Sequence, residues 1–382
     1  MKLTKLVNGQ SFQSFSTSQP QDQKVLFEEH TPAVFEFKLN APKNLNSLDL
    51  EMVDLMLGKV KEWNQSPNQA PRVALISGVG EKAFCAGGDI KQVYESGIGK
   101  LPAHVKSDFF AREYLLDYAL TQMKPKQISI WNGIVMGGGV GVSVHAPIRV
   151  ATDNTVYAMP ETGIGFFTDV GGSYFLSRVK NNINLGLYLG ITGFRLKSKD
   201  LVKWGIATHY VPKDRLSSLY SDLAKNISKS STDSDIVNIV NSHSDHTFDS
   251  EHIENVEEIN QIFKDDSIHK ILERLEASKS EFAQKTLKTI SGLSPLSMAV
   301  VFEQIKRGKS MNLKEVFEME YKISQGFCNH TEFFEGVRAL LIDKDKNPKW
   351  MHKSIHEVQD KDVEFFFDRS ETLNLDISKH QI

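Results

Sequence analysis

Three glycine-containing segments hold the residue types that acyl-transfer chemistry uses. They are residues 82–90 (KAFCAGGDI), 132–141 (NGIVMGGGVG) and 159–172 (MPETGIGFFTDVGG). The first two place small residues where a predicted strand gives way to a helix, so their turns expose backbone N–H groups to which the helix dipole adds partial positive charge. Two N–H groups that converge from separate turns can bind the oxyanion formed in acyl transfer, and glycine lets a carbonyl approach the backbone closely.

The third segment contributes two carboxylates, Glu161 and Asp169, which are eight residues apart across glycines and aromatic residues. If Met159, Phe166 and Phe167 are buried, burial raises the pKa of the neighbouring carboxyl groups toward the operating pH, as a general acid or base requires. The alternative is structural, with Glu161 as an acid at a helix N-terminus and Asp169 as a turn residue. The residues by themselves leave both interpretations open.

Two competing motifs fail at the second segment. A dinucleotide fingerprint that begins at Gly137 or Gly139 needs glycine at position 142 or 144, and both are valine. A nucleophile elbow built on Ser143 needs glycine at position 145, which is histidine. We therefore interpret His145, like His209, as a structural histidine.

The composition is that of a large globular protein. The chain has 382 residues, of which 40% are hydrophobic and 24% charged, enough for a large core and a second unit. The net charge is −3 with both signs interspersed, so no nucleic-acid partner and no anionic membrane surface is indicated. No apolar run approaches the roughly 20 residues that span a bilayer. Cys85 and Cys328 lack CxxC neighbours and are interpreted as free thiols.

The elements that must position these segments alternate between strands and helices. Strands are predicted at 24–29, 33–39, 72–77, 127–131 and 148–152, with helices after Ser47, at about 103–121 and after the second glycine segment. This alternation predicts an α/β fold with crossover connections. After Val211 the spacing is helical, and residues 228–250 are polar enough to predict a connecting segment. We divide the chain into an N-terminal segment (1–23), an α/β core (24–230) and a helical C-terminal region (231–382).

The N-terminal segment has two interpretations. Residues 1–21 contain no acidic residue, several serines, and the lysines Lys2 and Lys5, a composition that suits a mitochondrial transit peptide. The absence of arginine counts against a transit peptide, and the alternative is a flexible tail. In the second case the protein would remain in the cytoplasm.

Taken together, the three segments resemble the acyl-CoA site of the crotonase superfamily. The resemblance extends to residues 40–48 (NAPKNLNSL), and residues 189–211 and 333–350 are similar to the 3-hydroxyisobutyryl-CoA hydrolase family within it. It covers roughly residues 25–352. It implies a crotonase-like spiral of repeated ββα units with a helical C-terminal region. It also implies an oxyanion hole from the N–H groups of Gly88 and Gly138, and CoA contacts at Ala86, Gly88 and Asp89.

The hydrolase subfamily is indicated by what replaces the two hydratase glutamates. The first of these positions is Gly141 and the second is Glu161, while Asp169 in FFTDVGG matches the aspartate of the hydrolases' F-P-D-V-G. Glu113 in FFAREY aligns with a substrate-contacting glutamate of that family. The implied substrate contacts are therefore Glu113, Gly138, Glu161 and Asp169.

The resemblance implies hydrolysis of a short 3-hydroxyacyl-CoA, with 3-hydroxyisobutyryl-CoA of mitochondrial valine catabolism as the leading substrate. Glu161 would attack the thioester or activate water, and Asp169 would bind the 3-hydroxyl group. No metal or other cofactor is implied, since coenzyme A is part of the small-molecule substrate, and crotonase relatives often form homo-oligomers. The alternatives are an enoyl-CoA hydratase or isomerase, and a non-catalytic paralogue associated with the mitochondrial ribosome.

Four positions depart from the family pattern. Thr168 replaces a proline and releases a fixed φ beside Asp169, so we expect a looser turn there. Ala41 and Ala111 replace arginines, and Arg112 takes the place of a glutamate. The change at Ala41 is expected to weaken contacts with the CoA phosphates. These departures bear on which acyl group is preferred.

Overall fold

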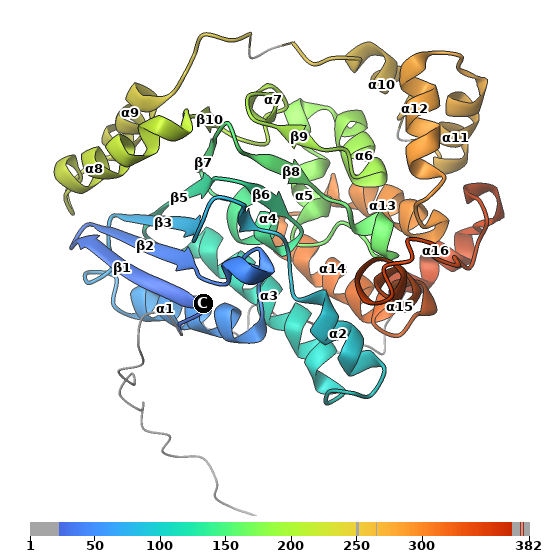
Figure 1. Cartoon of the computed structure of the whole chain (residues 1–382), viewed down its shortest axis with the longest axis horizontal. Coiled ribbons are helices and arrows are strands. Elements are labelled where there is room, and N and C mark those ends of the chain that lie inside the picture. The colour runs from blue at the N-terminus through green and yellow to red at the C-terminus, as the bar shows by residue number, and fades with distance from the viewer. Residues whose placement is uncertain (1–22, 250–251, 265, 369–374, 376, 378–382) are drawn as a thin grey trace, which may run out of the picture.

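The computed structural model describes residues 23–249, 252–264, 266–368, 375 and 377. The two interpretations of the N-terminal segment concern residues 1–22, which lie outside this described part. Figure 1 gives the arrangement of the elements, with the α/β part at the left and centre and the C-terminal helices at the right. No helix among the described residues combines the length and apolar character that crossing a membrane requires.

The main sheet has six strands in the order β1-β2-β3-β5-β7-β10. Its strands are β1 (Val25–Thr31), β2 (Val34–Leu39), β3 (Val73–Gly78), β5 (Lys126–Trp131), β7 (Ile148–Ala151) and β10 (His209–Tyr210). β1 and β2, which match the strands predicted at 24–29 and 33–39, form an antiparallel hairpin, and every other pair in this sheet is parallel. β3 reads VALISG and is buried along almost its whole length, as expected for a parallel strand covered on both faces.

A second sheet of four short strands lies over the first in the order β4-β6-β8-β9. Its members are β4 (Ala83–Cys85), β6 (Ile134–Met136), β8 (Val156–Ala158) and β9 (Leu196–Lys197), none of which the sequence analysis predicted. From β3 to β8, successive strand pairs place one strand in each sheet and then enter a helix or a 3₁₀ turn. These are the repeated ββα units of the predicted fold class.

Helix α1 (Leu50–Gln65) begins two residues later than a cap at Ser47 would require. The N-cap is Asp49, whose carboxylate accepts from the Met52 N–H, whereas the Ser47 hydroxyl bonds to the Asn44 carbonyl. Helix α3 (His104–Gln122) confirms the prediction at 103–121. The predicted connecting segment at 228–250 is wrong in part, because it contains helix α9 (Asp233–His243). A capping box formed by Thr232 and Asp235 starts α9.

The remaining helices follow the sheets and cover them. They are α2 (Ile90–Gly97), α4 (Gly138–Val144), α5 (Gly172–Leu176), α6 (Ile183–Thr192), α7 (Asp200–Lys203), α8 (Leu216–Asn226), α10 (Val256–Ile262), α11 (Ile268–Ala277), α12 (Glu281–Ile290), α13 (Pro295–Gly308), α14 (Leu313–Phe327), α15 (Thr331–Val337) and α16 (Asp360–Phe367).

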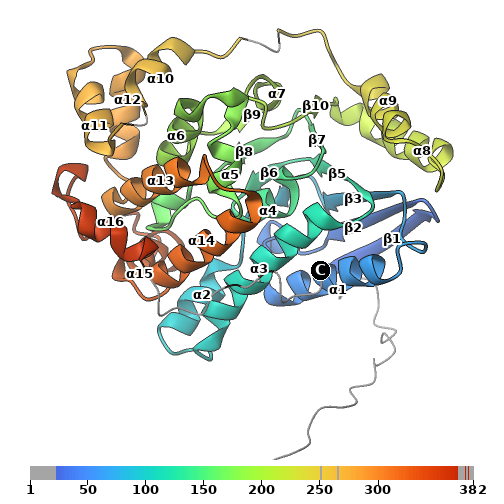
Figure 2. The ribbon, with the colours of Figure 1, turned by 180° about the vertical axis from the view of Figure 1, so that it is seen from behind.

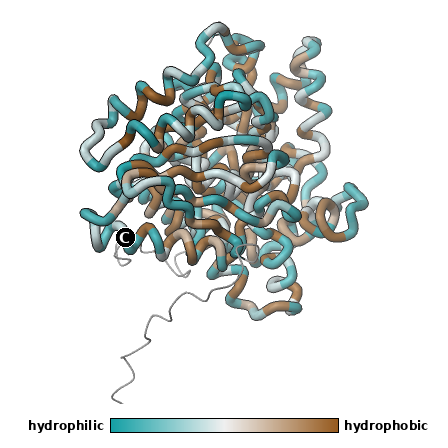
Figure 3. The backbone as a smooth tube through the Cα atoms, turned by 60° about the vertical axis from the view of Figure 1, so that its left-hand side comes forward, coloured by the Kyte–Doolittle hydropathy of each residue, from teal (hydrophilic) through white to brown (hydrophobic). Residues whose placement is uncertain are grey.

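One hydrophobic cluster extends from Val25 in β1 to Ile377 near the C-terminus. Helix α13 packs against α5 and α6, while α14 packs against α3 and α5. Figure 2 shows α14 beside α3 from behind, and in Figure 3 the hydrophobic segments gather inside the molecule. The C-terminal helices therefore complete the core around α3, while the domain boundary at residue 230 stays a prediction.

Candidate active site

Two glycine turns lie against each other, one between β4 and α2 and the other between β6 and α4. Gly87 has φ +119° and Gly137 has φ +47°, a left-handed backbone that glycine adopts without strain. A Cβ built on Gly138 would lie 3.2 Å from the backbone nitrogen of Gly88. The two turns are thus close enough for their N–H groups to meet at one substrate atom.

The backbone N–H groups of Gly88 and Gly138, the two predicted oxyanion donors, are not used in hydrogen bonds of the surrounding turns. Gly138 is the first residue of α4, so its N–H has no partner within the helix. The bridge beside Gly88 uses the Leu48 and Asp89 N–H groups, and within the described part of the chain the Gly88 N–H donates to no protein acceptor. Both groups therefore remain for a ligand.

Glu161 and Asp169 flank these turns in a buried, aromatic setting. Glu161 opens the 3₁₀ turn η2 (Glu161–Ile164) directly after β8, and its Oε1 lies 3.2 Å from the Cβ position of Gly137. Each of the two carboxyl side chains is 5% exposed, and the neighbouring Met159, Phe166 and Phe167 are buried, as the sequence argument required. The tertiary structure supplies the desolvation that was assumed for both acids.

A third acid, Glu113, reaches the same place from helix α3. Its side chain is 2% exposed, and its Oε1 lies 2.2 Å from the Cβ position of Gly138 and 3.6 Å from that of Gly88. Only glycine at position 138 leaves room for this carboxyl tip. The structure therefore brings Glu113, Glu161 and Asp169 together around the two glycine turns.

Burial dominates the ionisation of these acids. It raises the pKa of Glu161 well above the usual range, and the charge of Asp169 raises it further. Burial likewise raises the pKa of Asp169 to about 7, opposed by the Tyr114 hydroxyl, which donates to Asp169 Oδ2 at 2.8 Å. The pKa of Glu113 is raised well above its usual range by burial and then by the charges of Asp169 and Glu161. Carboxyl groups with raised pKa values beside two free N–H groups are suited to acid–base work on an acyl group.

Sequence reasoning missed two further buried acids, Asp117 and Glu320. Glu320 of α14 accepts from the Gly171 N–H at 2.7 Å and from the Ser173 N–H at 2.8 Å, so it holds the turn that follows Asp169. Burial raises the pKa of Glu320 to about 8. The available signal was an acid inside an apolar helical stripe, as in Tyr114-Leu115-Leu116-Asp117.

Two further side chains, those of Gln304 and His145, bond to the loop that carries Asp169. The Gln304 side-chain amide donates to the Thr168 carbonyl at 2.6 Å and to its hydroxyl at 3.1 Å, which ties Thr168 to α13. The looser turn expected there stays a prediction. His145 Nε2 lies 3.0 Å from the Val170 carbonyl oxygen, to which it donates, and burial lowers the pKa of His145 to about 4. His145 is therefore a neutral structural residue, as interpreted.

The predicted CoA contacts lie in the first turn and already make local bonds. The Ala86 N–H donates to the Leu45 carbonyl at 3.0 Å, and the Asp89 carboxylate caps helix α2 by accepting from the Gln92 N–H. These bonds shape the turn that presents Gly88. A role of Ala86 and Asp89 in binding CoA stays a prediction.

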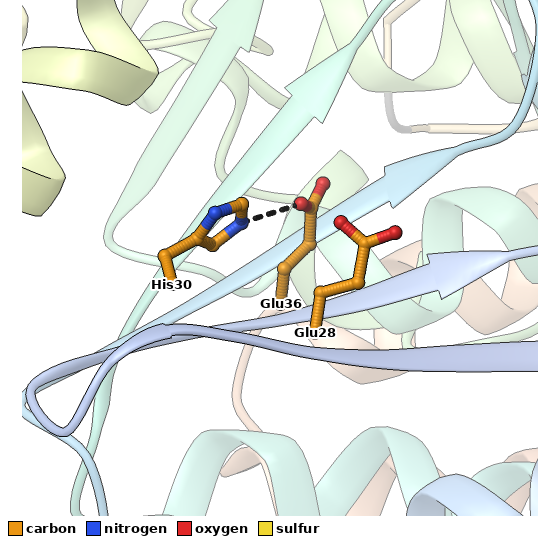
Figure 4. A group of neighbouring side chains, drawn as sticks. All are labelled: Glu28, His30 and Glu36. Carbon is orange, nitrogen blue, oxygen red and sulfur yellow. Dashed lines mark hydrogen bonds and ion pairs between the residues drawn. The ribbon is translucent and has the colours of Figure 1, made fainter.

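One other cluster of acids and a histidine lies on the hairpin, with Glu28 and His30 on β1 and Glu36 on β2 (Figure 4). Its ligand atoms lie within 4.8 Å of one another, as a metal site requires. However, the Lys38 ammonium lies 2.7 Å from Glu28 and 3.5 Å from Glu36 and already supplies a cation there. We interpret this cluster as an ion-pair network of the sheet.

Comparisons with known proteins agree on one family. The profile of the enoyl-CoA hydratase/isomerase family matches residues 34–367. A mitochondrial 3-hydroxyisobutyryl-CoA hydrolase of Xenopus laevis is 43% identical over 333 residues, covering 86% of this chain and 85% of the relative. The enzyme of that name from Dictyostelium discoideum is 42% identical over 368 residues, or 94% of each chain, and that of Homo sapiens is 40% identical over 332 residues, or 86% and 84%.

Solved structures give the same fold. A carnitinyl-CoA dehydratase from Mycobacterium thermoresistibile superposes with a TM-score of 0.84 at 31% identity, covering 93% of this chain and 99% of that one. An enoyl-CoA hydratase from Rhodobacter sphaeroides gives a TM-score of 0.78 at 27% identity, covering 91% and 97%.

Proposed function

This chain belongs to the enoyl-CoA hydratase/isomerase family, within its group of 3-hydroxyisobutyryl-CoA hydrolases, and from that premise we propose that it hydrolyses the thioester bond of 3-hydroxyisobutyryl-CoA. The products are 3-hydroxyisobutyrate and free coenzyme A. The observation that supports the proposal is the buried Glu161, whose Oε1 lies 3.2 Å from the Cβ position of Gly137, in the turn next to the free N–H groups of Gly138 and Gly88.

The glycine turns bind the thioester carbonyl. As a nucleophile adds to the carbonyl carbon, the Gly88 and Gly138 N–H groups donate to the oxygen, which becomes an oxyanion. Each donor of this kind is worth about 10²–10³ in rate. The buried surroundings strengthen the effect, because less water competes for the charge.

Glu161 supplies the base or the nucleophile. In one route its carboxylate attacks the thioester carbon, CoA leaves as the thiolate, and water then cleaves the acyl-enzyme anhydride. In the other route the carboxylate takes a proton from water as the water attacks the carbonyl, the C–S bond then breaks, and the proton passes to CoA, which leaves as the thiol. Both routes use the ionised side chain, so the raised pKa of Glu161 makes activity rise with pH through that pKa.

Asp169 and Glu113 orient the acyl group. The Asp169 carboxylate, steadied by the Tyr114 hydroxyl, accepts a hydrogen bond from the 3-hydroxyl of the substrate. Glu113 lies between the two glycine turns and fixes the position of the acyl group at the oxyanion hole. Such positioning contributes several kcal/mol, on the order of the effects known for oriented reactants.

The chemistry needs no metal and no cofactor beyond the coenzyme A of the substrate. The relatives described above are named as mitochondrial enzymes, and we propose the same compartment for this chain. A homo-oligomer, as crotonase relatives often form, is the assembly that we expect, and light scattering measures it.

The two alternatives are less favoured. A hydratase needs a second acid at position 141, and a glycine there cannot transfer a proton. A ribosome-associated role is opposed by the net charge of −3, since RNA-bound subunits tend to be basic. The names of the relatives also point to hydrolysis.

The test is release of free thiol from 3-hydroxyisobutyryl-CoA by the purified protein, with crotonyl-CoA hydration followed in parallel. Glu161→Gln is expected to abolish thiol release while binding of the acyl-CoA persists. Hydration of crotonyl-CoA without thiol release would overturn the assignment. If the protein neither releases thiol from 3-hydroxyisobutyryl-CoA nor hydrates crotonyl-CoA, and it co-sediments with ribosomes, the non-catalytic role is favoured.

A further inference from the structure

Asp117 is a buried acid that the proposed mechanism does not use. It lies on helix α3, and its side chain is fully buried. Neither of its carboxyl oxygens has a hydrogen-bond partner among the described residues. An unpaired buried polar atom destabilises the folded state, so a hydrogen-bond partner is expected at this position.

Two acids on helix α3 lie against two glycines on helix α4. Glu113 and Asp117 are four residues apart and therefore lie on one face of α3, while Gly138 and Gly141 are three apart and lie on one face of α4. Glu113 Oε1 would be 2.2 Å from a Cβ on Gly138, and Asp117 Oδ2 would be 2.5 Å from a Cβ on Gly141. Each carboxyl thus fills the space that a side chain on the glycine would take. Glu113 Oε1 also lacks a partner among the described residues.

The groups that face Asp117 are acids or neutral. They are Glu113 on its own helix, Asp169 from the third glycine segment, Glu320 from α14, and Cys85 from β4. Burial, and then the charges of Glu113, Asp169 and Glu320, raise the pKa of Asp117 well above its usual range. Burial therefore favours the protonated form of Asp117, as it does that of Glu113, and a protonated carboxyl has one O–H to donate.

We propose that Asp117 donates a hydrogen bond to the Glu113 carboxylate, directly or through one buried water, so that the two side chains share one proton along a face of α3. Asp117 is a positioning residue: it fixes the Glu113 carboxyl between the glycine turns. This role rests on the proposed function, because Glu113 acts there on the substrate. It also gives position 141 a reason to be glycine beyond the absence of hydratase chemistry.

The pH dependence of thiol release tests the shared proton. In the parent enzyme the proton is lost at alkaline pH, the two carboxylates repel each other, and kcat/KM falls. Asp117→Asn keeps the shape and donates from its amide at every pH, so the alkaline limb is expected to move up by about one pH unit or more. Asp117→Leu removes the donor and is expected to lower kcat/KM about tenfold, the size of one lost hydrogen bond. Asp108→Asn, the same change at a half-buried position of α3, is the matched control.

Folding stability provides a readout that does not depend on the substrate. An acid with a raised pKa in the folded state binds more protons folded than unfolded, so its contribution to stability falls as pH rises from about 4 to the folded pKa. Asp117→Asn removes this penalty. The ratio of the unfolding equilibrium constant of Asp117→Asn to that of the parent should therefore decrease about tenfold for each pH unit between about pH 4 and the folded pKa of Asp117.

The outcomes separate the two proposals. If the thioester is not hydrolysed but the stability difference still grows with pH, the protonated Asp117 is supported and the proposed function fails. A stability difference that does not change with pH overturns the shared proton. If the alkaline limb of the pH–rate profile does not move in Asp117→Asn, the positioning role is overturned. The role is also overturned if Asp117→Asn shifts that limb by the same amount in a protein that already carries Glu113→Gln.

Discussion

Replacing Gly138 by alanine tests the oxyanion hole with a single methyl group. Gly138 opens helix α4 without a positive φ, so alanine fits the backbone and keeps the N–H. The new Cβ would lie 2.2 Å from Glu113 Oε1 and 3.2 Å from the Gly88 nitrogen. It therefore displaces the Glu113 carboxyl and occupies the space between the two proposed donors.

The expected effect is large on catalysis and small on stability. Excluding the carbonyl from one donor should lower kcat by about 10²–10³, or roughly 2.7–4 kcal/mol of transition-state stabilisation. Alanine in place of glycine within a helix contributes about 1 kcal/mol to folding, which opposes the cost of moving the Glu113 carboxyl tip. The free energy of unfolding should therefore change much less than the activation free energy.

The assay is thiol release at saturating and limiting 3-hydroxyisobutyryl-CoA, with denaturant unfolding of the same preparations. Gly58→Ala is the control, because Gly58 is exposed on α1 and its Cβ would meet no atom within 4 Å. That variant should gain about 1 kcal/mol in stability with unchanged kcat/KM. Activity of Gly138→Ala within about threefold of the parent would refute the placing of the oxyanion between these turns.

Three further outcomes follow from the contacts of the site and of the sheet. Glu320→Ala leaves the Gly171 and Ser173 N–H groups without their acceptor, so unfolding in urea should show a loss of about 2–6 kcal/mol, and a loss below 1 kcal/mol would contradict the role of Glu320. Tyr114→Phe removes the hydrogen bond that lowers the pKa of Asp169, so the pKa of Asp169 should rise above about 7. The acid limb of the pH–rate profile should then move to higher pH. An acid limb that does not move would count against the contact between Tyr114 and Asp169. Glu36 raises the pKa of His30, so the stability from this pair is present below about pH 6.5 and is lost as pH rises through the folded pKa. His30→Gln should flatten that decline in pH-dependent unfolding, and an identical slope would show that the pair does not titrate as described.

The sequence by itself determined five of the six strands of the main sheet, the glycine turns and the family. β3 (VALISG) is an almost continuous apolar run, and β5 (KQISIW) places Ile128 and Ile130 two residues apart before Trp131, so each strand is indicated by its own residues. Gly87, Gly88 and Gly137 to Gly139 mark turns because their requirement is local to the backbone. The acids Glu161 and Asp169 were predicted from one contiguous motif, and Glu113 from the resemblance of FFAREY to the hydrolase family.

Only the tertiary structure decided which groups lie buried together. β4, β6 and β8 have three residues each, too few to show a period, and their pairing partners come from other repeats. Asp117 and Glu320 each stand beside apolar helix residues in the sequence, but that signal does not show which distant segments cover them. Their burial depends on α4, α14 and the Asp169 loop meeting from distant parts of the chain. Desolvation is set by all the neighbours of a group at once, so the pKa values that shape this site exist only in the folded protein.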